Sequence, residues 1–280
     1  MFHRANPLSL WERVRVRVIP RVNTLTPALS QRERERGRGP GTALAMCPGM
    51  IFRQLFDQET WTYTYLIGDE TTREAALVDP VFEQVERDLQ VVKELDLKLT
   101  LVLETHIHAD HVTGAGRLRE LTGARVAASA AGAPCVDRPV KDGEELALGG
   151  LRIQVLATPG HTDDSVSFRV GSKLFTGDAL LIRACGRTDF QNGDAGQLYD
   201  TITQRLFTLP DETEVYPGHD YTGQTMSTIG EEKRHNPRLA GRSREWFVEF
   251  MNSRKLAPPK KLDIAVPANR ACGKPAQAMS

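Results

Sequence analysis

Three histidines and one aspartate lie close together in the segment 105–111, THIHADH. His106 and His108 are two positions apart and Asp110 is next to His111, which suits a compact loop. One face of a helix would need a spacing of three or four. The whole chain of 280 residues holds only seven histidines. Because imidazole nitrogens and carboxylate oxygens bind divalent transition metals, the segment predicts a metal site.

Further histidines and aspartates follow other apolar runs, mostly at turns that contain glycine or proline. One such residue alone is more often a helix cap or a surface residue than a metal ligand. Here five of the seven histidines lie at turns of this kind, and together they indicate one shared site. The additional candidates are Asp79, His161, Asp178 and His219.

The elements that must position these residues form an α/β pattern. The continuous apolar run 99–103 predicts a buried strand, and the glycines after the histidine-rich segment begin a helix. Further strands are predicted over 61–68, 75–78, 125–128, 146–148, 151–157, 166–170, 174–175 and 215–216, and helices over 81–95, 112–121, 195–206, 227–234 and 244–252. This order predicts two sheets covered by helices, with their strand ends meeting at one crevice.

The composition indicates a globular domain behind an unusual N-terminal stretch. Apolar residues make up 40% of the chain, which is enough for a core. Residues 1–49 carry nine arginines, three glutamates and no lysine, a net +6 that leaves −6 for residues 50–280. We expect a disordered basic extension over 1–49, and Met46 and Met50 favour a translation artefact over a transit peptide. Residues 50–280 are then the catalytic domain with its C-terminal helices.

Several classes of function and location are disfavoured by the same data. The acidic remainder offers no basic face for nucleic acid. No apolar run approaches the ~20 residues that cross a bilayer, and no signal peptide pattern is present. Cys47, Cys135, Cys185 and Cys272 are far apart and form no CxxC pair, so we expect no disulfide framework and a reducing, cytoplasmic compartment.

The order HxHxDH, then His, Asp and His resembles the metallo-β-lactamase superfamily from about residue 51 to the region after His219. That resemblance implies an αββα sandwich, the metallo-β-lactamase fold, with the metal site at one edge. The segments 180–191, 216–222 and 264–269 more specifically resemble the persulfide dioxygenases, which act on glutathione persulfide. The match covers most of residues 51–273.

The resemblance implies one Fe(II) per chain, held by His106, His161 and Asp178. Two imidazoles and a carboxylate on one face of an octahedron would leave the opposite face for the persulfide sulfur and O₂. The remaining donors would orient ligands or a bound water, although in relatives they complete a site for two zinc ions. These residues are Asp79, His108, Asp110, His111 and His219.

The implied reaction oxidises glutathione persulfide with O₂ and water to sulfite and glutathione, a step of sulfur metabolism that detoxifies hydrogen sulfide. Arg187 is expected near the substrate, where its planar fork suits a carboxylate, or alternatively in a surface ion pair with Asp189. Tyr221 is expected to donate a hydrogen bond in the pocket, or alternatively to pack as an aromatic side chain. Cys185 has no evident partner base and is not assigned to catalysis. The family also implies a homodimer.

Two other functions fit the same ligands. A glyoxalase-II-like hydrolase would use two Zn²⁺ ions to cleave a glutathione thioester. Thr188 to Phe190 and the short region of 61 residues after His219 speak against it. A non-catalytic metal-storage or sulfide-sensing module would bind metal without turnover.

Overall fold

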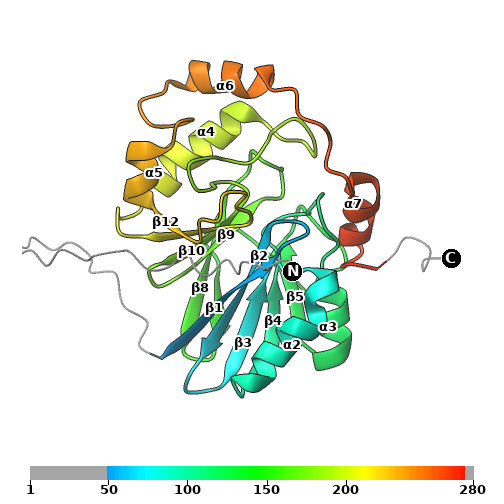
Figure 1. Ribbon diagram of the computed structural model, residues 1–280. Coiled ribbons are helices and arrows are strands. Elements are labelled where there is room, and N and C mark those ends of the chain that lie inside the picture. Colours follow the sequence, from blue (N-terminus) through cyan, green and yellow to red (C-terminus); the bar gives the residue numbers. More distant parts are fainter. Residues whose placement is uncertain (1–48, 275–280) are drawn as a thin grey trace, which may run out of the picture. The chain divides into compact units, whose positions relative to one another are not determined.

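Two six-stranded sheets lie face to face in the computed structural model, which describes residues 49–274 (Figure 1). The first contains, in spatial order, β1 (Met50–Asp57), β2 (Thr62–Asp69), β3 (Glu74–Val78), β4 (Lys98–Leu103), β5 (Arg125–Ser129) and β6 (Arg138–Val140). The second contains β12 (Ser227–Thr228), β11 (Glu214–Pro217), β10 (Lys173–Gly177), β9 (Val166–Val170), β8 (Leu151–Ala157) and β7 (Glu145–Leu148). Strands β3 to β6 run parallel, as do β10 and β11, and the other neighbours are antiparallel.

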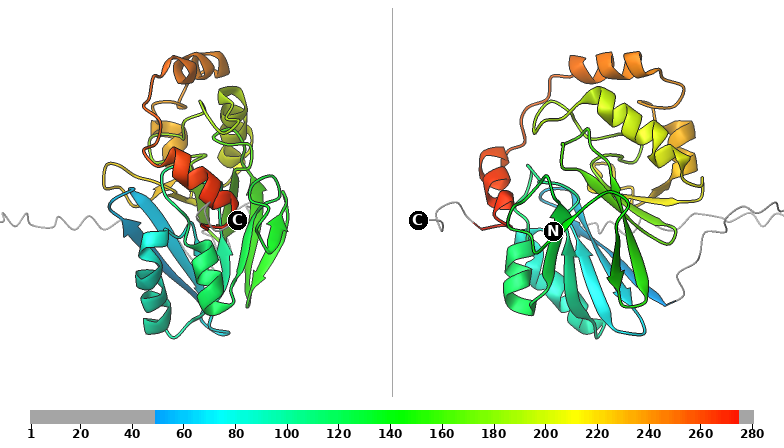
Figure 2. Two further views of the ribbon diagram at one scale, coloured as in Figure 1. Left: turned by 90° about the vertical axis from the view of Figure 1, so that its right-hand side faces the viewer. Right: turned by 180° about the vertical axis from the view of Figure 1, so that it is seen from behind.

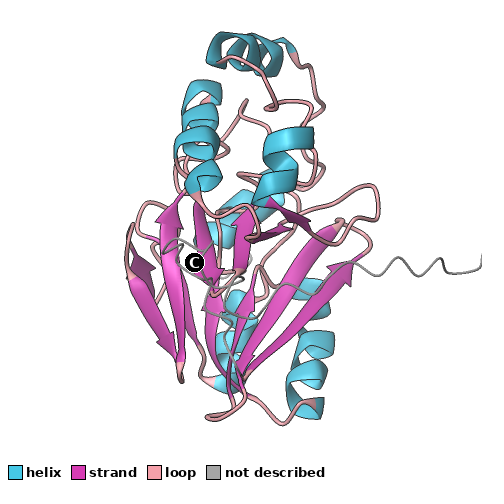
Figure 3. Ribbon diagram, turned by 90° about the vertical axis from the view of Figure 1, so that its left-hand side faces the viewer, coloured by secondary structure: helices cyan, strands magenta, loops and turns pink. Residues whose placement is uncertain are grey.

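Helices cover the outer face of each sheet, so that the strands lie between two groups of helices (Figure 3). The first sheet is covered by α2 (Val85–Glu94), preceded by a 3-10 turn (Phe82–Gln84), and by α3 (Ala115–Thr122). The second is covered by α4 (Ala195–Gln204), a 3-10 turn (Leu206–Thr208), α5 (Ile229–His235) and α6 (Arg244–Ser253). The last helix, α7 (Leu262–Arg270), lies beside α3 (Figure 2). The predicted αββα sandwich is confirmed.

Three apolar clusters hold these layers together. Tyr65, Phe168 and Phe175 are fully buried in the cluster between the sheets. The other two clusters lie between each sheet and its helices. Since both faces of the central strands are buried, the strands read as continuous apolar runs in the sequence. Within residues 49–274 no helix has the length and apolar character to span a membrane.

The structure contains elements that the sequence did not predict. Strands β1 and β6 and helix α7 were not expected, and residues 227–228 are a short strand rather than the start of a helix. Thr228 caps α5 instead, because its hydroxyl accepts a hydrogen bond from the Glu231 amide (3.2 Å). Apart from Gly49, the predicted basic extension lies outside the described residues.

The expectation that no disulfide forms is wrong. Cys135 and Cys272 are joined, with their Cα atoms 5.9 Å apart across a sequence separation of 137 residues. Local spacing could not reveal this pair, because the two cysteines meet only when α7 docks beside α3. The argument for a reducing compartment, which relied on unpaired cysteines, therefore loses its basis.

A buried carboxylate on α2 gives a test of the fold that is independent of the metal site. Arg87 donates two hydrogen bonds to Oδ1 of Asp88 (2.9 and 2.8 Å), whereas Oδ2 has no partner among the described residues. Burial raises the pKa of Asp88 from 3.8 to about 6, against the opposing effect of the Arg87 charge. The folded protein therefore holds this proton more tightly than the unfolded chain does.

The stability that the neutral Asp88 carboxyl contributes is present below pH 4 and is lost as the pH rises through about 6. Asp88→Asn should remove this dependence, so the free energy of unfolding of the wild type should fall by about 2–3 kcal/mol relative to the variant between pH 4 and pH 7. Urea unfolding at both pH values measures the difference. Glu86→Gln, at an exposed position of the same helix, should show no such change.

Candidate metal centre

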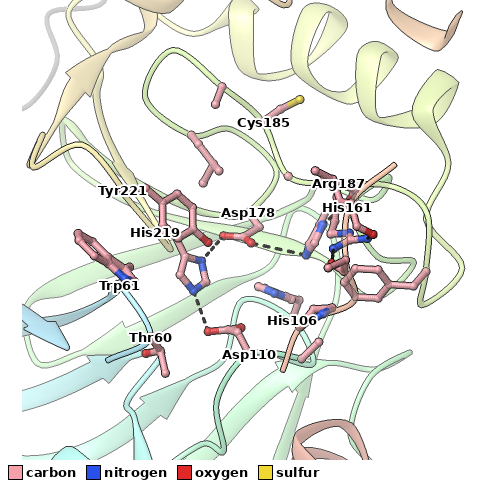
Figure 4. A pocket seen from close by; sticks show the side chains of 18 of the residues that line it. Thr60, Trp61, His106, Asp110, His161, Asp178, Cys185, Arg187, His219 and Tyr221 are labelled. Atoms are coloured by element: carbon pink, nitrogen blue, oxygen red, sulfur yellow. Dashed lines mark hydrogen bonds and ion pairs between the residues drawn. The ribbon is translucent and has the colours of Figure 1, made fainter. Parts of the chain in front are cut away.

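Three of the predicted ligands come together where the ends of the two sheets meet (Figure 4). His106 follows β4 of the first sheet, while His161 and Asp178 follow β8 and β10 of the second. Each offers one donor atom, and these atoms lie within 4.8 Å of one another. Two imidazole nitrogens and one carboxylate oxygen at this spacing fit a divalent transition metal.

The orientation of His106 is fixed from behind by a chain of hydrogen bonds. Its Nδ1 lies 2.9 Å from Oγ1 of Thr105, and that hydroxyl donates to Oδ2 of Asp79 (2.8 Å). The Thr105 hydroxyl therefore accepts from Nδ1–H, which leaves the Nε2 lone pair of His106 for a metal. Burial, with neighbouring histidines, lowers the pKa of His106 well below its usual value, so the ring is in the neutral form that binds metals.

His161 is oriented in the same way by a main-chain group. Its Nδ1 donates to the carbonyl oxygen of Arg187 (2.6 Å), which again leaves Nε2 as the free donor atom. This Nε2 lies 3.7 Å from Oδ2 of Asp178. The loop after β10 thus supplies both one ligand and the group that orients another.

Asp178 is held by His219, which connects it to the histidine-rich segment (Figure 4). Nδ1 of His219 lies 2.8 Å from Oδ1 of Asp178, and Nε2 lies 2.9 Å from Oδ2 of Asp110. Although burial lowers the pKa of His219, the two carboxylates raise it well above its usual value. Both ring nitrogens of His219 are therefore engaged by acids, and Asp178 keeps Oδ2 for a metal.

The other predicted donors form two adjoining groups. His108, Asp110 and His111 also have donor atoms within 4.8 Å of one another. Nδ1 of His111 lies 2.9 Å from Asp110, and its Nε2 is buried without a partner among the described residues. His108 faces Asp79, with Nε2 3.2 Å from Oδ1, and lies 3.6 Å from Glu104. Burial raises the pKa of Glu104 to about 8, and sequence reasoning did not single out this residue.

A cavity of about 720 Å³ opens onto the three candidate ligands. Arg187 and Tyr221 both line it. The guanidinium of Arg187 is paired with both carboxylate oxygens of Asp189 (2.6 Å each) and donates to the carbonyl oxygen of Ala257 (2.7 Å). The ring of Tyr221 stacks on that of His219, with centroids 6.0 Å apart, and the residue is 63% exposed. The ion pair and the aromatic packing that were considered as alternatives are thus both present.

Comparison with known proteins places this site in a family. The model of the metallo-β-lactamase superfamily matches residues 62–134 and 133–219. The bovine (Bos taurus) mitochondrial persulfide dioxygenase ETHE1 is 47% identical over 227 residues, covering 80% of this chain and 89% of that protein. The crystal structure of ETHE1 from Myxococcus xanthus superposes with a TM-score of 0.80 at 64% identity, covering 80% of this chain and all of that one. The chain belongs to the persulfide dioxygenase family.

The chain is also similar, at lower identity, to a hydrolase of glutathione derivatives. The hydroxyacylglutathione hydrolase of Roseobacter denitrificans is 34% identical over 186 residues, covering 65% of this chain and 71% of that protein. Both the sequence identity and the covered length are smaller than for the bovine persulfide dioxygenase. The resemblance noted in the sequence is therefore confirmed at the level of the superfamily and of the family, and the site is a His/Asp metal site of the metallo-β-lactamase type.

Sequence reasoning missed four basic residues that line the same cavity, Arg238, Arg254, Lys260 and Lys261, of which the two arginines lie nearer Cys185. Arg238 donates from Nη1 to the carbonyl oxygen of Cys185 (2.6 Å), close to Sγ of Cys185 (3.5 Å). Arg254 makes no ion pair within residues 49–274, and burial and the neighbouring charge of Arg238 lower its pKa. Their distance along the chain from the histidine-rich segment concealed them, and only their basic character could have drawn attention to them. In this member of the persulfide dioxygenase family they make the wall of the cavity positive.

Proposed function

We propose that the protein is an iron-dependent dioxygenase that converts glutathione persulfide, O₂ and water into sulfite and glutathione. The sulfur–sulfur bond breaks, the terminal sulfur loses four electrons to O₂, and its three oxygens come from O₂ and water. The observation that carries the proposal is the set of three donors at His106, His161 and Asp178.

Ferrous iron bound to these side chains would supply electrons to O₂ and leave coordination positions for the persulfide sulfur. The chain itself supplies geometry and charge. Thr105, the Arg187 carbonyl and His219 hold the three ligands in fixed orientations. Tyr221, at the mouth of the cavity, is proposed to donate a hydrogen bond to the substrate.

The size and charge of the cavity support a glutathione derivative as substrate. A volume of about 720 Å³ is typical for a small-molecule site. Glutathione carries two carboxylates, and Arg238 and Arg254 offer guanidinium groups on the wall of the cavity. A substrate carboxylate bound beside Arg238 and Arg254 would balance their positive charge, because neither arginine forms an ion pair with an acidic side chain among the described residues.

Arg187→Ala is expected to raise the KM for glutathione persulfide about tenfold while metal content stays unchanged. The side chain holds the segment 256–257 of the cavity wall, but His161 is oriented by the Arg187 carbonyl, which the substitution keeps. Oxygen-uptake kinetics and metal analysis of one preparation give both values. Arg244→Ala, which removes an exposed ion pair with Asp200, is the matched control and should leave KM unchanged. Loss of metal from Arg187→Ala would show that its role is wrongly assigned.

A dinuclear zinc hydrolase is the second candidate. It is favoured by the second donor group at His108, Asp110 and His111, in which the buried Nε2 of His111 has no partner among the described residues. Two metal ions placed there would generate a hydroxide for thioester cleavage. The lower identity to the hydroxyacylglutathione hydrolase, over a smaller part of the chain than the persulfide dioxygenase match covers, disfavours this arrangement.

The deciding experiment is metal analysis of anaerobically purified protein, followed by two assays. The dioxygenase predicts one iron per chain, O₂ uptake with glutathione persulfide and no thiol release from S-lactoylglutathione. Two zinc ions with thioester cleavage would establish the hydrolase. Bound metal with neither activity would indicate a storage or sensing module. The predicted homodimer and cytoplasmic location remain proposals, which light scattering and cell fractionation would test.

A further inference from the structure

One side chain from the end of the chain binds the main chain of the histidine-rich segment at three points. Nδ2 of Asn269 donates to the carbonyl oxygens of His108 and His111 (2.9 Å each). Its Oδ1 accepts from the amide of Thr113 (2.8 Å). Asn269 is 3% exposed, so water does not compete for these bonds. Both N–H donors and one of the two acceptor lone pairs of the Asn269 side-chain amide therefore bind the main chain of residues 108–113.

The loop depends on such a partner because its backbone follows neither a strand nor a helix. Buried carbonyl and amide groups without a partner are costly, and the regular ladders of β4 and α3 end on either side of this stretch. Without Asn269, the carbonyl groups of His108 and His111 would lose their side-chain donor. The loop could then relax into conformations that carry His106 and Asp110 away from the positions described above.

Two further features fix Asn269 in place. Cys272, three residues later, is bonded to Cys135 in the loop after β5. The Cys272 carbonyl accepts from the amide of Gly116 in α3 (2.9 Å) and lies where a Cβ atom of residue 116 would be. Any larger residue at position 116 would push the tail away. The tail 268–273 is therefore attached to α3 and to the loop after β5, beside the histidine-rich segment.

We propose that Asn269 is a positioning residue of the metal centre, and that the Cys135–Cys272 disulfide keeps it seated on the histidine-rich loop. Among the described residues, Asn269 makes no hydrogen bond to the side chains of the three proposed ligands and does not line the cavity of about 720 Å³, so it acts through the backbone of residues 108–113. This inference rests on the proposed metal assignment but not on the substrate. A protein that bound metal through this loop and oxidised no persulfide would still depend on Asn269.

The test compares Asn269→Ala with Asn236→Ala, because Asn236 is a buried asparagine that also makes three hydrogen bonds. Its Nδ2 donates to Ala184 and Glu232, and its Oδ1 accepts from Arg238, all outside the histidine-rich loop. Both variants should lower the melting temperature of the metal-free protein to a similar degree. Only Asn269→Ala should weaken Fe²⁺ binding, by about 10- to 100-fold, in anaerobic competition with a chelator.

Two more variants separate positioning from folding. Asn269→Asp keeps the size of the side chain and an acceptor for Thr113, but it replaces the two donor bonds by repulsion between a carboxylate and two carbonyls. It should bind Fe²⁺ at least as weakly as Asn269→Ala. Cys135→Ser removes the disulfide alone and should weaken binding severalfold. The proposal is overturned if Asn269→Ala binds Fe²⁺ like the wild type, or if Asn236→Ala loses affinity equally. Fe²⁺ binding is measured without substrate, so a failed persulfide assay would not affect either outcome.

Discussion

Asp178→Ala is expected to reduce bound metal and O₂ uptake to background. Asp178 supplies the only carboxylate of the three-donor set, and its other oxygen accepts from His219. Removal of the side chain leaves only two imidazoles, which bind a divalent transition metal weakly without a carboxylate. It also frees His219 to reorient. Metal analysis of anaerobically purified protein, with oxygen-electrode assays, measures both losses.

Asp189→Ala is the matched control for this experiment. Asp189 is an acid on the same loop, but it pairs with Arg187 and touches none of the three ligands. Its removal should leave the metal in place. If Asp178→Ala kept one iron per chain, the ion would have to be held by the second donor group, and the assignment of His106, His161 and Asp178 would be wrong.

Gly186→Ala is expected to have the second largest effect, although residue 186 carries no functional side chain. A Cβ atom there would overlap the carbonyl oxygen of Asp178 and lie 2.7 Å from Nδ1 of His161. Both neighbours are fixed, because Nδ1 of His161 donates to the carbonyl of Arg187 and the carbonyl of Asp178 accepts from the amide of residue 186 itself (2.7 Å). The ring would have to move, and a displacement of about 1 Å at such a site costs on the order of 100-fold in rate.

Activity, metal affinity and thermal unfolding of Gly186→Ala should therefore all fall. Gly223→Ala serves as the control, because no atom lies within 4 Å of its Cβ position and only its positive φ of 86° carries a cost, about 1 kcal/mol. That variant should keep its metal. A Gly186→Ala protein with full metal and normal turnover would mean that the loop after β10 is free to shift, contrary to its contacts.

The central strands and the grouping of candidate ligands that follow them could be predicted because both signals are local. The run 99–103 is mostly apolar, and His106, His161 and Asp178 each follow such a run within a few residues. Strand β1 gave a weaker signal, because it is an edge strand whose burial alternates irregularly and whose pairing with β2 runs along its whole length. Helix α7 is short and contains Pro267, and a proline inside a segment disfavours the prediction of a helix there.

What could not be predicted depends on contacts between distant parts of the chain. The positions of His161 and Asp178 near His106 followed from the resemblance and from the turns, but the engagement of His219 with two acids did not. The Cys135–Cys272 bond and the contacts of Asn269 span more than 130 residues, and no spacing rule reports them. Arg187 illustrates the same limit, since only the structure shows that its guanidinium donates two hydrogen bonds to the carboxylate of Asp189.

The division of the three donors between the two sheets has a consequence for the life of the protein in the cell. An ion that contacts His106 on one side and His161 and Asp178 on the other binds the closed sandwich and has no equivalent site in the opened chain. Occupancy at 100 times the dissociation constant would add about 2.7 kcal/mol to the free energy of unfolding. Chains made during metal starvation would open more often and be degraded sooner, so the abundance of the protein would follow the supply of its metal.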